Sequence, residues 1–213
     1  MKAINAIFAC MLSVSVPTFA ESNFNPSINI DLQTRVSYVN DRIDNHIRHD
    51  ASVFKGDYFL LSVSGQVTDR LTYSWRQRIN QKKERSDRFD GTDWVYLDYK
   101  LDDHWSVAAG KQVAMVGGYE YDRNPVDIYV SSEFWNNIAP FQFGASATYT
   151  TTNGKNRFTA QVTQSLFNTP ANRDMLAYHL HCAGNYGWLN TLYSANMIEY
   201  VPGRYISYIA LGN

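Results

Sequence analysis

Two arginines at an alternating spacing are the first candidates for chemistry in this sequence of 213 residues. Arg76 and Arg78 stand two residues apart in "LTYSWRQRI" (71–79), and a strand points side chains at this spacing to the same side. A guanidinium presents its N–H donors in a fixed fork that matches the oxygens of a carboxylate or a phosphate. The pair is therefore a candidate contact for anions. Ordinary charge balance with Asp31 or Asp98 is the alternative interpretation.

Three more basic residues join the arginine pair as candidate anion contacts. Arg35 and Arg157 fall on the polar side of strand-like segments. Lys111 falls on the apolar side if its segment alternates regularly. It stands near the end of that segment, where a long side chain reaches water or a β-bulge changes the alternation.

A second set of charges lies in the long connection 113–140, which is long enough to fold inward over other strands. Its charges would then stand on opposite sides of a narrowed passage. An external lid and a contact with a neighbouring subunit are the alternatives. The candidate constriction residues are Glu120, Asp122, Arg123 and Asp127.

The histidines do not predict a metal site or a catalytic site. His179 and His181 share one face of a strand-like segment, but no third ligand stands at a diagnostic spacing. His46, His49 and Asp50 supply acid–base groups without a recognisable arrangement of nucleophile, base and orienting partner. We therefore expect no enzyme activity, no metal and no cofactor.

The elements that would position these side chains are strands, because apolar residues recur at every second position. In "INIDLQTRVSYV" (28–39) they alternate with polar and charged residues, a period typical of a strand with two different faces. No segment of comparable length has a helical period. The strand-like segments are 28–39, 57–67, 71–79, 93–101, 105–112, 141–149, 157–165, 175–183, 189–197 and 205–213.

One face of these segments carries almost all of the charge. A charge that faces lipid costs roughly 2–4 kcal/mol at the bilayer midplane, whereas a water-filled interior accepts it. The pattern therefore favours an apolar face toward lipid and a polar face around a lumen. Aromatic residues near the segment ends fit the girdles of a membrane interface: Tyr38, Tyr58, Trp105, Phe141, Tyr149 and Trp188.

The connections between the segments alternate in length. Long connections, such as 40–56 and 80–92, are followed by tight turns at 68–70 and 102–104. Transmembrane barrels have short turns at one rim and long loops at the other, and their tilted strands need about 9–11 residues. The sequence therefore predicts an all-β fold, an antiparallel transmembrane β-barrel with about ten up-and-down strands in this chain.

The amino terminus predicts export. Residues 1–20 have a short positive start at Lys2, an apolar stretch and small residues in "TFA" (18–20), which indicates a signal peptide cleaved before Glu21. The barrel domain would then be 21–213, with Cys182 as its one cysteine and so no internal disulfide. A formal net charge of -1 gives no general attraction to nucleic acid. We expect a protein of the bacterial outer membrane.

The segment "AAGKQVAMVGGYEYDRNPVDIYVSSEFWNNIAPFQFGASATY" (108–149) resembles the phosphate-selective porin O and P family of Gram-negative outer membranes. The strand end "GKQ" (110–112), the acidic and aromatic loop, and the next alternating strand carry the resemblance. It implies a barrel of about sixteen strands, usually trimeric, that passes anions or small solutes. The chain ends at "ALGN" without the carboxy-terminal aromatic strand of such porins, so an amino-terminal fragment or a truncated form is expected, with a small closed barrel as the alternative.

These observations together predict an outer-membrane porin that passes small polar solutes, including anions such as phosphate, by passive diffusion. Its expected partners are outer-membrane lipid, small anionic or polar solutes and further copies in a homotrimer, with no nucleic acid. Two other classes stay open. One is an outer-membrane barrel enzyme of the protease type, and the other is a soluble exported β-sandwich that acts as a binding module.

Overall fold

The computed structural model describes residues 26–50, 52–80, 89, 91–128, 130–169 and 171–212. The predicted signal peptide, residues 1–20, and most of the charged connection 80–92 lie outside these residues. The predictions made for those two segments therefore stay predictions.

Ten strands form one antiparallel sheet in which each strand pairs with the next one along the chain. This is the up-and-down arrangement that the alternating segments predict. The strands are β1 (Ser27–Val39), β4 (Val53–Gln66), β5 (Leu71–Arg78), β6 (Thr92–Lys100), β7 (Trp105–Val113), β8 (Phe141–Thr150), β9 (Asn156–Gln164), β10 (Leu176–Asn185), β11 (Asn190–Val201) and β12 (Arg204–Gly212).

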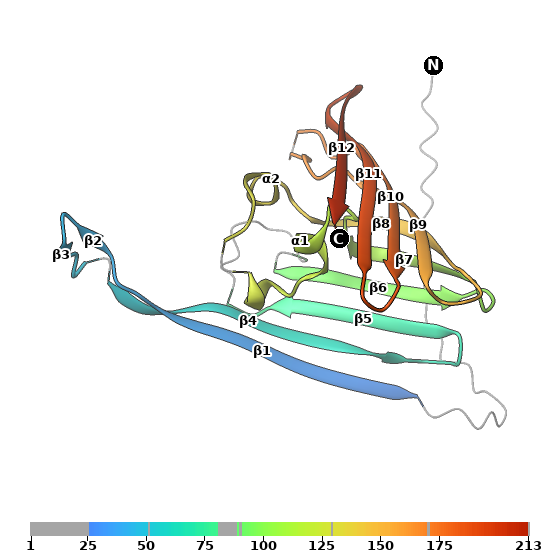
Figure 1. Cartoon of the computed structure of the whole chain (residues 1–213), viewed down its shortest axis with the longest axis horizontal. Coiled ribbons are helices and arrows are strands. Elements are labelled where there is room, and N and C mark those ends of the chain that lie inside the picture. The colour runs from blue at the N-terminus through green and yellow to red at the C-terminus, as the bar shows by residue number, and fades with distance from the viewer. Residues whose placement is uncertain are drawn as a thin grey trace, which may run out of the picture.

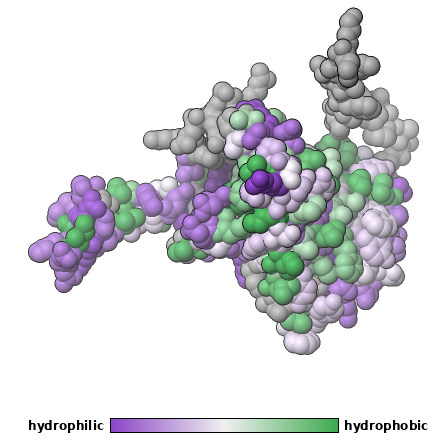
Figure 2. All heavy atoms as spheres, turned by 90° about the horizontal axis from the view of Figure 1, so that it is seen from above, coloured by the Kyte–Doolittle hydropathy of each residue, from purple (hydrophilic) through white to green (hydrophobic). Residues whose placement is uncertain are grey.

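The sheet is strongly curved and open. β1 and β12 are its two edges and do not pair with each other in the part of the chain that the structure describes. β1 and β4 run beyond the neighbouring strands as a projecting arm that ends in the small hairpin of β2 (Arg42–Ile43) and β3 (His46–Ile47) (Figure 1). The arm is mostly hydrophilic, whereas hydrophobic patches lie on the body of the molecule (Figure 2).

The two faces of the sheet have opposite character, and the apolar face is the exposed one. Leu32 and Phe143 are 58% and 38% exposed. On the other face Gln161 and His179 are each only 2% exposed. A soluble sandwich would bury Leu32 and Phe143 between two sheets, but the described residues form a single large sheet. Apolar residues outside and polar residues inside are typical of strands that span a membrane.

Short turns join the strands at one rim of the sheet. In the turn between β6 and β7, the carboxylate of Asp102 accepts hydrogen bonds from the backbone N–H groups of His104 and Trp105, at 2.7 and 2.8 Å. These two bonds hold the pKa of Asp102 below its ordinary value. The long connection between β7 and β8 lies at the other rim, as the sequence predicts.

The longest connection, between β7 and β8, contains three short helical turns: α1 (Tyr119–Asp122), η1 (Pro125–Asp127) and α2 (Glu133–Asn136). It lies within the concave side of the sheet (Figure 1). Among the described residues, no helix has the length and apolar character needed to cross a membrane.

A buried apolar cluster fixes this connection against the later strands. Ala114 and Val116 of the connection are almost fully buried with Ala177 of β10 and Ile198 of β11. Phe134 of α2 stacks on Tyr208 of β12, with ring centres 4.3 Å apart. The core of the molecule is therefore where the inward connection meets the concave face.

Leu180→Arg tests whether the exposed apolar face meets lipid. Leu180 stands near the centre of β10, opposite Ala160 and Ala195, and is 63% exposed. Arginine there should lower the free energy of unfolding from lipid vesicles by roughly 2–4 kcal/mol, measured by urea titration, because the charge would stand in hydrocarbon. Trp188→Arg, in the turn before β11, is the control and should cost at most about 1 kcal/mol. Equal costs at both positions would contradict a lipid-facing surface.

Candidate functional site

The arginine pair of β5 shares one carboxylate. Nε of Arg76 donates to Oδ2 of Asp93 at 2.7 Å, and Nε of Arg78 donates to Oδ1 of the same residue at 2.9 Å. The side chains of Arg76 and Asp93 are only 5% and 4% exposed, whereas that of Arg78 is 26% exposed. Two guanidiniums and one carboxylate leave an excess of positive charge, and Arg78 presents it to the interior.

A β-bulge brings Asp93 to this position. Arg76 pairs with Trp94 and Gln77 pairs with Thr92, so Asp93 is an extra residue between the two pairs. In a regular strand Asp93 would share the apolar face with Val95, but a bulge turns its side chain toward the arginines. Sequence reasoning expected Asp31 or Asp98 as the balancing charge and missed Asp93. The available signal was the position of Asp93, an acidic residue where regular alternation of the segment 93–101 places the apolar face.

Aromatic rings surround the two guanidiniums. The guanidinium carbon of Arg76 lies 3.6 Å from the ring centre of Trp94, and that of Arg78 lies 5.5 Å from Tyr58. Phe141 of β8 lies 5.6 and 5.9 Å from the two guanidiniums. Cations at such distances are attracted to the faces of aromatic rings. The rings therefore help to hold the two guanidiniums in place.

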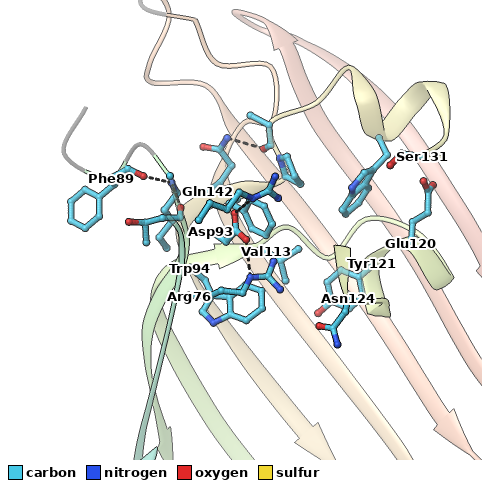
Figure 3. A pocket seen from close by; sticks show the side chains of 18 of the residues that line it. Arg76, Phe89, Asp93, Trp94, Val113, Glu120, Tyr121, Asn124, Ser131 and Gln142 are labelled. Atoms are coloured by element: carbon cyan, nitrogen blue, oxygen red, sulfur yellow. Dashed lines mark hydrogen bonds and ion pairs between the residues drawn. The ribbon is translucent and has the colours of Figure 1, made fainter. Parts of the chain in front are cut away.

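The arginine pair borders a cavity of about 680 Å³. Figure 3 shows Arg76, Asp93, Trp94 and Gln142 of the sheet on one side of this space, with Glu120, Tyr121, Asn124 and Ser131 of the long connection facing them. The cavity therefore has one wall of sheet residues rich in arginine and aromatic rings. Its other wall belongs to the inward connection.

Hydrogen bonds hold the long connection between β7 and β8 to strands on both sides of the sheet. At one side, the backbone N–H of Gly117 donates to Oγ of Ser194 at 2.9 Å, and that of Met115 donates to Oε1 of Gln161 at 2.9 Å. Gly117 has a φ of +90°, a left-handed backbone that glycine adopts without strain. The connection therefore crosses the polar face of the sheet.

Arg35 of β1 holds the other side of the connection. Its Nη1 donates to the backbone carbonyls of Val126 and Ile128, at 3.0 and 2.9 Å. Its Nε donates to Oδ2 of Asp57 at 3.3 Å, and its guanidinium lies 4.6 Å from the ring centre of Tyr58. Asp57 is itself an extra residue in β4, because Arg35 pairs with Tyr58 and Val36 pairs with Gly56.

The candidate constriction residues occupy different places. Glu120 and Arg123 line the cavity, and Oε1 of Glu120 accepts a hydrogen bond from the backbone N–H of Ser132 at 2.6 Å. Asp127 is exposed and does not line the cavity. The side chain of Asp122 lies outside the described part of the chain.

Of the other two basic candidates, Lys111 lines the same cavity as the arginine pair, whereas Arg157 does not. Lys111 pairs with Val95 and Phe143 and so belongs to the apolar face, where its ammonium donates to the backbone carbonyls of Thr92 at 2.7 Å and Phe89 at 3.1 Å. Arg157 is exposed at the start of β9, near the short turns, and does not line the cavity.

His179 and His181 of β10 each lie against other side chains of the protein. Nδ1 of His179 lies 2.8 Å from Oδ1 of Asn196, and Nε2 lies 3.3 Å from Oγ1 of Thr163. Tyr121 of α1 packs beside His181, with ring centres 5.2 Å apart. Within the described residues, no three His, Cys, Asp or Glu side chains are grouped so that they could hold a metal ion.

Arg76→Met should lower the free energy of unfolding by about 3 kcal/mol, because it leaves the buried charge of Asp93 with Arg78 as its one strong partner. Urea titration in lipid vesicles measures this change. The double variant Arg76→Met, Asp93→Asn should recover most of the loss, since it removes the poorly paired charge. A single-variant loss of roughly 0–1 kcal/mol, typical of a surface ion pair, would contradict a buried shared carboxylate.

The sequence model of the family phosphate-selective porin O and P matches residues 28–195, which include the arginine pair, the inward connection and strands β1 to β10. No curated protein and no solved structure matches the chain. The match agrees with the antiparallel sheet and its exposed apolar face, and membership of this family implies an outer-membrane porin. The chain belongs to the phosphate-selective porin O and P family.

Proposed function

We propose that this chain forms a channel that passes small polar solutes by passive diffusion, with a preference for anions such as phosphate. The observation that carries the proposal is the excess positive charge of Arg76 and Arg78, presented to a cavity on the polar face. Fixed charge and width select solutes in a water-filled pore. Arg78 contacts the passing anion, because it is the more accessible of the two guanidiniums.

The inward connection narrows the passage. Glu120 and Arg123 supply opposed charges on its cavity side, and Arg35 acts by holding the connection against β1. Arg35 is thus a positioning residue in this proposal, since its donors already bond to two carbonyls and Asp57. Arg157 contributes general positive charge near the opposite rim. Lys111 also lines the cavity, where its ammonium donates to the carbonyls of Thr92 and Phe89 and so stabilises the strand end.

The remaining predictions concern export and assembly. Cleavage before Glu21, insertion into outer-membrane lipid and assembly into a homotrimer are part of the proposal. The enzyme alternative gains no support from His46, His49 and Asp50, which lie on the exposed hairpin, where Asp50 pairs with Arg48 at 3.1 Å. The alternative of a soluble β-sandwich gains no support either, because the described strands form one large open sheet and not two packed sheets.

Planar-bilayer recording of the refolded chain tests the channel and its selectivity. We expect discrete conductance steps and a reversal potential in a salt gradient that indicates anion preference. Arg78→Gln should reduce the anion-to-cation permeability ratio about fivefold, since a unit charge about 4 Å from a permeating ion contributes ~1 kcal/mol in water. Arg157→Gln removes the same charge away from the cavity and should have a smaller effect. Unchanged selectivity in Arg78→Gln would exclude it as the anion contact.

Arg35→Ala tests the positioning role. The connection should lose its hold on β1, so single-channel current should become noisier and the mean conductance should rise. Asp57 keeps a partner in Lys55, at 3.3 Å, so the loss of Arg35 does not leave that carboxylate alone. Arg157→Ala is the matched control for lost charge and should keep quiet openings. Equal noise in both variants would contradict a specific role for Arg35.

A further inference from the structure

The cavity beside the arginine pair has the size of a binding site for an organic molecule. Its volume of about 680 Å³ lies within the roughly 300–1,000 Å³ of pockets that enclose small organic ligands. Inorganic phosphate would occupy a small part of this space. The size therefore raises the question of which larger anion the lining would recognise.

Aromatic rings line the cavity from both walls. Tyr58, Trp94 and Phe141 come from three strands of the sheet, and Trp135 comes from α2 of the inward connection. Such rings attract flat apolar groups through burial of surface and through stacked or edge-on ring contacts. An inorganic anion gains nothing from these contacts, because it has no apolar surface to bury.

The charged groups of the cavity select an anion. The Nε groups of Arg76 and Arg78 are occupied by Asp93, and Arg78 remains partly exposed with aromatic rings near its guanidinium. A carboxylate matches the remaining edge of a guanidinium. The lining also holds polar side chains, among them Asn124, Ser131 and Gln164, which can donate further hydrogen bonds to an anion.

We propose that this cavity binds organic anions that carry a flat apolar group, with aromatic carboxylates as the representative class. The carboxylate meets Arg78, and the ring lies among the aromatic side chains, with Trp135 opposite the sheet. This inference rests on the proposed function, because it assigns the cavity as a binding step within the channel.

Block of chloride current through the full refolded chain in planar bilayers tests the inference. Benzoate and acetate are added in turn, and acetate serves as the matched ligand because it has the carboxylate without the ring. Benzoate should reach half-block at a concentration about tenfold lower than acetate, since the ring adds contacts with aromatic side chains. Equal half-block concentrations would overturn the inference while leaving the channel proposal intact. Absence of conductance steps would overturn both.

Two tryptophan variants locate the binding site. Trp135→Ala should remove most of the difference between benzoate and acetate, because it deletes a ring on the wall opposite the arginines. Trp188→Ala is the matched control, since Trp188 is 89% exposed in a turn and does not line the cavity. If the benzoate preference survives in Trp135→Ala, or falls equally in Trp188→Ala, the assignment to this cavity is wrong.

Discussion

Hydrocarbon cannot hydrate charge, and this constraint organises the whole sheet. Regular alternation sends most charged side chains of the strands to the concave face. Two β-bulges do the same for acidic residues that would otherwise point outward, Asp57 in β4 and Asp93 in β6. Each of these carboxylates then meets an arginine, Arg35 or Arg76. The requirement that keeps charge out of lipid therefore also builds the ion pairs of the interior.

The ion pairs at Asp93 and those at Asp57 have different consequences for the passage of solutes. The group at Asp93 leaves positive charge and aromatic rings beside the cavity, which favours anions. The group at Asp57 supports Arg35, whose donors bond to the inward connection. Width and charge are therefore set by separate residues. Tyr58 links them, because its ring lies 4.6 Å from Arg35 and 5.5 Å from Arg78.

The strands could be predicted from the sequence because a two-residue period is a local signal. All ten segments correspond to strands of the sheet, although β4 begins earlier than predicted, at Val53, and β11 continues to Val201. The hairpin of β2 and β3 is too short to have a period and was missed. Asp93 was missed because regular alternation assumes that no bulge intervenes. The path of the long connection depends on contacts between distant residues, such as Gly117 with Ser194, which no local pattern encodes.

The central claim is that the apolar face contacts lipid while the polar face surrounds water. Spin labels at successive cysteines along β8, from Ala145 to Thr148, in a chain with Cys182 replaced by serine, test it most directly in lipid vesicles. Residues 145 and 147 should be accessible to oxygen, which concentrates in hydrocarbon, and residues 146 and 148 to a water-soluble paramagnetic reagent. Accessibility without this two-residue alternation, or with the two faces reversed, would contradict the account.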